Sequence, residues 1–259
     1  MKRIILLRFH KDLPMVQNRI DLLKHFNPDM EIHGMFGGKK EEFETYKKEL
    51  MGLDSIYYLD IAEYDTKWRF SDYCILTWYK DFGHTLSFDV VHTIEYDLVI
   101  LDSLEIIYPY APGEKHIYLT GLAVLDEVKN TWDWFTDPVE CPVDEENAFV
   151  KLMKSKYGLQ NLYACLAPGA TLTREYLEGY AKLNLPLIAH DEVRYPAIAQ
   201  ILNIPMKDTN FDPTTWEKDD PLFNCNISEV TVDDALKAYK AGKRKVFHAV
   251  YGLLNVSEL

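Results

Sequence analysis

The chain has 259 residues, of which 47% are hydrophobic, 13% aromatic and 27% charged, a composition that excludes a disordered polypeptide. Acidic residues outnumber basic ones by 41 to 28, the formal net charge is −13 and no basic run occurs, so nucleic acid is not an expected partner. The four cysteines are scattered and form no C-x-x-C pair, which argues against a structural zinc site. The sequence shows neither a signal-peptide core nor the roughly 18 consecutive apolar residues of a membrane span, so we expect a cytoplasmic protein.

The first part of the chain predicts a β-α-β unit. Residues 4–9 form an apolar run typical of a buried parallel strand, the spacing of apolar residues predicts a helix over 15–26, and a second strand at 31–38 ends in Gly37-Gly38. Such units form parallel sheets with right-handed crossovers. The segments that follow are a charged helix at 39–50, a third strand at 55–61, an aromatic-rich helix at 68–83 and a fourth strand at 87–94.

The second part is less regular. We expect a strand at 116–125, a surface loop at 130–147, a strand, turn and helix within 162–183, helices at 190–203 and 231–242, and a final strand at 243–252. Pro168-Gly169 marks the turn, Thr173 is the expected N-cap of the helix after it, and Gly242 closes the last helix. Without a repeat or a clear linker, residues 1–259 are expected to form one α/β domain.

The fourth predicted strand leads into Glu95-Tyr96-Asp97, which apolar residues flank on both sides. In an extended backbone residues i and i+2 point to the same side, so both carboxylates would face one point at the carboxyl end of the strand, where ligands of open α/β sheets collect. Two carboxylates in an apolar setting are costly unless a cation lies beside them, and Mg²⁺ or Mn²⁺ prefers such oxygen ligands. A solvated strand end explains this short pattern equally well.

Three later residues are candidates for related chemistry. His248, in the sequence KVFHAVYG, is acceptable to Mn²⁺, although a histidine on an apolar strand is more often a core residue. Asp191 and Glu192 open the helix at HDEVRYP, where a carboxylate can accept a proton from an attacking hydroxyl. Stabilisation of the helix N-terminus explains the same two acids at least as well.

The end of the first predicted strand, LLRFHKD, is a natural place to meet a nucleotide. We assign Arg8 and Phe9 to cofactor binding, with Arg8 contacting a phosphate or stacking on a base. The loop is not rich in glycine, which excludes a dinucleotide fingerprint and a P-loop. The aromatic set of the 68–83 segment is typical of a core, with stacking on sugars or bases as the alternative; it comprises Trp68, Phe70, Tyr73, Trp78 and Tyr79.

Taken in order along the chain, the β-α-β start, the carboxylate pair ending a central strand, the HDE helix start and the late FH resemble the GT-A fold of nucleotide-sugar-dependent glycosyltransferases. The resemblance covers about residues 3–250 and leaves 125–147 unmatched. It implies a single Rossmann-like domain with a central mixed, mostly parallel sheet flanked by helices. The donor-binding part would be about residues 1–105 and the acceptor side about 106–259.

The resemblance also implies an activity. Glu95-Tyr96-Asp97 would be the counterpart of the acidic motif that holds Mn²⁺ or Mg²⁺ against the donor diphosphate, with Glu95 in a donor-binding place, Asp97 as the main metal ligand and His248 completing the site. Asp191 or Glu192 would match the catalytic base. The expected function is transfer of a sugar from a nucleotide-sugar donor to a sugar, glycan or glycolipid acceptor.

Other functions remain open from the residues. A sugar nucleotidyltransferase ranks lower because RFHKDLPM lacks the glycines of its usual loop. A non-catalytic nucleotide-sugar or carbohydrate-binding module on a degenerate transferase fold would leave Glu95, Asp97 and His248 as structural polar groups. A phosphoesterase would need more His and Asp ligands than this chain brings together.

Overall fold

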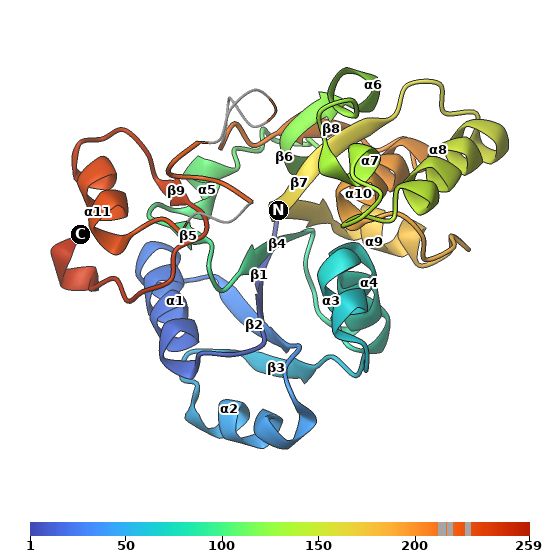
Figure 1. The fold of residues 1–259 in the computed structure, drawn as a ribbon. Coiled ribbons are helices and arrows are strands. Elements are labelled where there is room, and N and C mark those ends of the chain that lie inside the picture. The colour runs from blue at the N-terminus through green and yellow to red at the C-terminus, as the bar shows by residue number, and fades with distance from the viewer. Residues whose placement is uncertain (212–215, 217–219, 226–228) are drawn as a thin grey trace.

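A seven-stranded mixed sheet forms the centre of the computed structural model, which describes residues 1–211, 216, 220–225 and 229–259 (Figure 1). Its strands are β1 (Arg3–Phe9), β2 (Glu31–Phe36), β3 (Ser55–Tyr58), β4 (Val90–Glu95), β6 (Ile117–Val124), β7 (Tyr163–Thr173) and β8 (Met206–Asp208). They lie in the order β3-β2-β1-β4-β7-β6-β8, and only β7 runs antiparallel to its neighbours. The predicted α/β class with a mostly parallel mixed sheet is confirmed.

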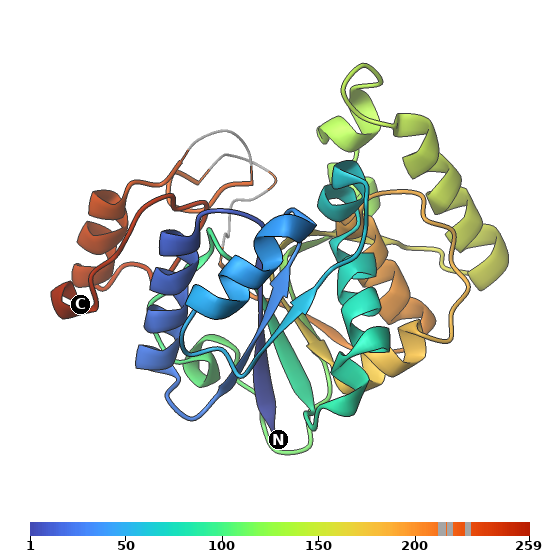
Figure 2. The ribbon, with the colours of Figure 1, turned by 90° about the horizontal axis from the view of Figure 1, so that it is seen from below.

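Helices cover both faces of this sheet (Figures 1 and 2). They are α1 (Leu13–Phe26), α2 (Phe43–Glu49), α3 (Tyr64–Arg69), α4 (Ser71–Asp81), α5 (Leu104–Ile107), α6 (Leu125–Val128), α7 (Asp133–Thr136), α8 (Val143–Tyr157), α9 (Arg174–Tyr180), α10 (Asp191–Ile201) and α11 (Val232–Lys240), with 3-10 turns at Lys40–Glu42, Gly83–Thr85 and Val256–Glu258. Among the described residues no helix is both long and apolar enough to cross a membrane.

The central strand β1 shows why the sheet is covered on both sides. Successive side chains of a strand point to opposite faces. Ile4 and Leu6 therefore pack in the core under α4, α9 and α10, whereas Ile5 and Leu7 pack in the core under α1. All four are fully buried, as expected of a strand whose sequence is continuously apolar.

Two expectations for the second half are wrong. The segment 130–147 is not simply a loop, because it holds α7 and the beginning of α8. No turn separates strand from helix at Pro168-Gly169, because β7 continues through these residues to Thr173 with a shift in its register to β6. Thr120 Oγ1 donates to the Pro168 carbonyl, and Gly169 adopts φ 77°, so the irregular stretch keeps a hydrogen bond.

The end of the chain returns to its beginning. The expected final strand is only β9 (Val246–Phe247), which pairs antiparallel with β5 (Val99–Ile100) in a separate two-stranded sheet. Beyond β9 the chain passes beside α1 (Figure 1). Residues just after β4 and residues near the C-terminus therefore meet.

Candidate functional site

Parallel pairing places Arg8 directly beside Glu95 at the carboxyl ends of β1 and β4. The Arg8 guanidinium lies 2.6 Å from Glu95 Oε1, and both side chains are at least four-fifths buried. Burial raises the pKa of Glu95, although the Arg8 charge opposes the shift. The second oxygen, Glu95 Oε2, is buried without a hydrogen-bond partner.

Asp97 contacts Tyr251 and His248, whereas Glu95 pairs with Arg8. The chain turns after β4, with the Leu98 amide donating to the Glu95 carbonyl, so the extended backbone that would aim both carboxylates at one point is absent. Asp97 Oδ2 accepts a hydrogen bond of 3.0 Å from the Tyr251 hydroxyl, and Asp97 Oδ1 lies 3.8 Å from His248 Nε2.

The His248 ring is oriented by the backbone. Its Nδ1 lies 2.6 Å from the Asn224 carbonyl oxygen, which can only accept, so Nδ1 is the donor of this hydrogen bond. The other ring nitrogen, Nε2, faces the Asp97 carboxylate. Histidine ligands of metals commonly donate their other N–H to a carbonyl in this way.

Residues 250–254 are fastened to α1 by two neighbouring side chains. Arg19 donates to the carbonyls of Val250 and Gly252 at 2.9 and 3.0 Å. Asn18 exchanges two hydrogen bonds with the backbone of Leu254. We call these four contacts the α1 clamp. Arg19 is almost fully buried, and burial lowers its pKa to about 10.

The donor set suits a divalent ion that is shared with a substrate. In the described part of the chain no cluster of three or more His, Cys, Asp or Glu side chains is placed to hold a metal. Asp97 and His248 supply one oxygen and one imidazole nitrogen, a combination acceptable to Mn²⁺. Ions of this kind commonly take their remaining ligands from water and substrate phosphates.

Asp191 lies at the first turn of α10 and is buried. Its carboxylate accepts hydrogen bonds from the Ser71 amide, at 3.0 Å, and from the Ser71 hydroxyl. Burial, with the neighbouring charge of Glu192, raises the pKa of Asp191 to about 7. Although burial opposes it, the pKa of Arg8 is raised by nearby negative charge, chiefly of Glu95 and also of Asp191.

Glu192 has structural partners instead. Its Oε1 accepts from the Ala167 amide at 2.9 Å, and its Oε2 lies 3.4 Å from His190 Nε2. Asp191 and Glu192 both lie in the first turn of α10, where the helix dipole favours negative charge, and the N-cap residue His190 makes no side-chain cap hydrogen bond. Phe9 packs against Phe36 and is 3% exposed, so its ring belongs to the core, and we leave it out of the proposed site.

Sequence reasoning missed the surroundings of His190. This buried ring stacks on Trp134, with centroids 4.1 Å apart, and lies 3.1 Å from Glu146 Oε2. Burial alone lowers the pKa of His190, but hydrogen bonds with Glu146 and Glu192 outweigh burial and raise it to about 9. The signal in the sequence is a glutamate at a core-facing position of α8, one turn before Phe149.

No protein-family model matches the chain, and no curated protein matches it.

Solved structures with partly similar folds include two glycosyltransferases and a cytidylyltransferase. The galactosyltransferase LgtC in complex with donor and acceptor sugar analogs is 14% identical with a TM-score of 0.45, covering 82% of this chain and 76% of that one. Glucosyl-3-phosphoglycerate synthase from Mycobacterium tuberculosis, in complex with Mn²⁺, UDP and glucosyl-3-phosphoglycerate, is 13% identical with a TM-score of 0.41, covering 80% and 70%. A cytidylyltransferase from Leptospira borgpetersenii is 13% identical with a TM-score of 0.45, covering 94% and 85%. Similarity at this level carries no argument about the activity of this chain.

Proposed function

We propose that this protein is a metal-dependent glycosyltransferase that moves a sugar from a nucleotide-sugar donor to an acceptor hydroxyl. The observation that carries the proposal is the pair formed by Asp97 Oδ1 and His248 Nε2, an oxygen and an imidazole nitrogen that lie 3.8 Å apart at the carboxyl edge of the sheet. Ligands of open α/β sheets bind at this edge. We assign the donor to about residues 1–105 and the acceptor side to about 106–259.

Asp97 and His248 are the proposed ligands of Mn²⁺ or Mg²⁺. The bound ion would neutralise negative charge that develops on the departing nucleoside diphosphate. Arg8 adds a fixed positive charge beside Glu95 at the same edge. A cation next to these groups would also offset the cost of burying Glu95 Oε2 without a partner.

Asp191 is the proposed base. A carboxyl group with a pKa of about 7 is partly ionised at neutral pH and can accept a proton from an acceptor hydroxyl. Glu192 does not share this role in the proposal, because its oxygens are occupied by Ala167 and His190. Its part is to hold the beginning of α10 in place.

A thermal-shift screen of nucleoside diphosphates and nucleotide sugars, with and without Mn²⁺, tests the proposal. A ligand at 100 times its dissociation constant stabilises the native state by about 2.7 kcal/mol, a shift of several degrees. We expect a Mn²⁺-dependent shift that Asp97→Asn removes.

The control is Asp89→Asn. Asp89 immediately precedes β4, at the opposite edge of the sheet, and its side chain is mostly exposed. This variant should keep the full shift. A shift that persists in Asp97→Asn, or that no nucleotide produces at millimolar concentration, would contradict the metal–diphosphate site.

A further inference from the structure

Trp68 on α3 is the most exposed tryptophan side chain among the described residues, with 62% of its surface accessible. A contiguous exposed apolar patch marks an interaction site more often than a single exposed apolar side chain does. The ring of Trp134 on α7 lies 5.6 Å from it, at an interplanar angle of 37°. Trp134 itself is held from behind by its stack on the buried His190.

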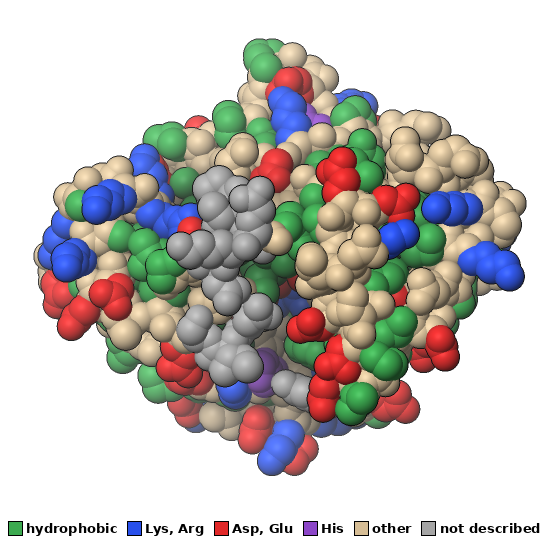
Figure 3. Space-filling view, turned by 45° about the horizontal axis from the view of Figure 1, so that its top comes forward, with side chains coloured by type: hydrophobic (Ala, Val, Ile, Leu, Met, Phe, Trp, Pro, Cys, Tyr) green, Lys and Arg blue, Asp and Glu red, His purple; other side chains and the backbone are tan. Residues whose placement is uncertain are grey.

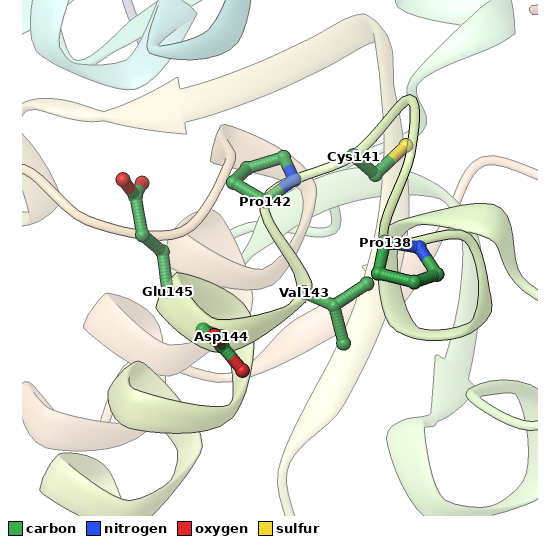
Figure 4. A pocket seen from close by; sticks show the side chains of 6 residues that line it. All are labelled: Pro138, Cys141, Pro142, Val143, Asp144 and Glu145. Atoms are coloured by element: carbon green, nitrogen blue, oxygen red, sulfur yellow. The ribbon is translucent and has the colours of Figure 1, made fainter.

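An ion pair links these two aromatic rings to a pocket. The Arg69 guanidinium lies 6.0 Å from the centre of the Trp134 ring and 2.7 Å from Glu145. Glu145 lines one side of a pocket of about 270 Å³ (Figure 4), whose other lining residues are Pro138, Cys141, Pro142, Val143 and Asp144. The aromatic rings, the ion pair and the pocket form one surface, which we call the Trp68 surface.

The Trp68 surface adjoins the proposed site. Lys67, next to Trp68, donates from Nζ to the Gly37 carbonyl just beyond β2 at 2.9 Å. Ser71, three residues after Trp68, holds the Asp191 carboxylate. The short helix α3 therefore lies between the carboxyl edge of the sheet and the proposed base.

The charge of this region restricts what can bind. Between Lys129 and Lys151 the chain has no lysine or arginine and five acidic residues that are exposed or half-buried: Asp133, Asp137, Glu140, Asp144 and Glu145. Acidic and hydrophobic side chains, with a few basic ones, lie intermixed over the half of the molecule that carries α7 and α8 (Figure 3). A phosphorylated or otherwise anionic ligand is disfavoured there, whereas carboxylates accept hydrogen bonds from neutral hydroxyl groups.

We propose that the Trp68 surface binds a neutral oligosaccharide acceptor, with one sugar ring stacked on Trp68 and the next directed towards Glu145 and the pocket. The apolar face of a pyranose presents polarised C–H bonds, which suit the negative face of an indole ring. This inference rests on the proposed function for its link to Asp191, but the binding step itself needs neither metal nor donor.

The test uses fluorescently labelled full-length protein on an array of immobilised neutral and sialylated oligosaccharides, in buffer without metal or nucleotide. We expect binding to neutral oligosaccharides, a loss of about tenfold in affinity for Trp68→Ala, and retention of most of it for Trp68→Tyr, which keeps an aromatic face. Met51→Ala is the matched control, because Met51 is a similarly exposed apolar side chain, 69% accessible, outside this surface.

Several outcomes would overturn the inference: no neutral oligosaccharide bound, equal binding by wild type and Trp68→Ala, or binding confined to sialylated glycans. Self-association that Trp68→Ala abolishes, measured by sedimentation, would instead assign the surface to a protein contact. Failure of the proposed function gives a different pattern, in which oligosaccharides still bind through Trp68 but nucleotides with Mn²⁺ produce no thermal shift.

Discussion

His190 is a buried imidazole held between two carboxylates and an indole ring. A charged ring in the interior is stable only if it is paired and hydrogen-bonded, and Glu146 and Glu192 provide that pairing at 3.1 and 3.4 Å. Through these contacts one ring joins α7, α8 and the beginning of α10. His190 therefore supports both the proposed base, Asp191, and Trp134 of the Trp68 surface.

This pairing makes stability depend on pH. The pKa of His190 is about 9 in the folded protein, against 6.5 when unperturbed, so between these values the native state binds more protons than the unfolded state. The free energy of unfolding should therefore decrease as pH rises from 6.5 to 9, by up to about 3 kcal/mol from this residue. Urea unfolding at pH 6.5 and 9 measures the change.

In His190→Gln this decrease should be much smaller, because the glutamine side chain does not titrate. His25→Gln, at an exposed position of α1, should keep the wild-type slope. Equal slopes in wild type and His190→Gln would mean that the ring is neutral in the folded state.

At the level of elements, the α1 clamp and the pairing of β9 with β5 together hold the segment that carries His248 and Tyr251. Arg19→Met should lower the free energy of unfolding by about 2–4 kcal/mol, because it leaves the carbonyls of Val250 and Gly252 without their partner. The same variant should lose the Mn²⁺-dependent nucleotide shift, because Tyr251 and His248 no longer face Asp97. Urea unfolding and the thermal-shift screen measure the two effects.

Lys24→Met, on the same helix, is the control, because the Lys24 side chain is one-third exposed and its ion pair with Asp54 is 3.5 Å long. It should change stability by less than about 0.5 kcal/mol. Arg19→Met with a full nucleotide shift would show that the C-terminal segment keeps its place without the clamp.

The elements that the sequence predicts well are those with a local signal. Thr173 caps α9 by accepting from the Tyr176 amide, and Gly242 follows α11 at φ 67°, as expected from their residue types. The sequence does not predict the beginning of α8, because its buried face includes the charged residue Glu146, which interrupts the apolar periodicity. Only the structure shows that Glu146 is buried because it pairs with His190. At Pro168-Gly169 the turn signal was overridden by pairing with β6.

The candidate site divides in the same way. The sequence places Arg8 and Glu95 at the ends of two strands, but their meeting depends on β1 and β4 being neighbours in the sheet. The approach of Asp97 to His248 depends on the pairing of β5 with β9 and on Arg19, which no local pattern encodes. Phe9 has a site-like position in sequence, but strand alternation turns its ring into the core.

For the whole molecule, the dominant feature is a net charge of −13. Charges of one sign repel one another in the compact state, and salt screens this repulsion, with a Debye length that falls from about 30 Å at 0.01 M to about 3 Å at 1 M. The melting temperature at pH 7.5 should therefore rise by a few degrees over this range of NaCl. The measurement is calorimetry at each salt concentration.

At pH 5 the same series is the control, because the pI is about 5.0 and the net repulsion is small. The melting temperature there should change little with salt. A fall with salt at pH 7.5 would mean that ion pairs such as Arg8–Glu95 outweigh the general repulsion.

The return of the chain to its beginning also has a consequence for synthesis. Asp97 is translated about 150 residues before His248. While the ribosome adds those residues, β1, β2 and β4 can already pair. Asp97 and Arg19 do not yet have their partners in residues 248–252. The proposed metal site is therefore completed only after the segment around His248 has emerged, and a nascent chain carries β1, β2 and β4 before it carries the site.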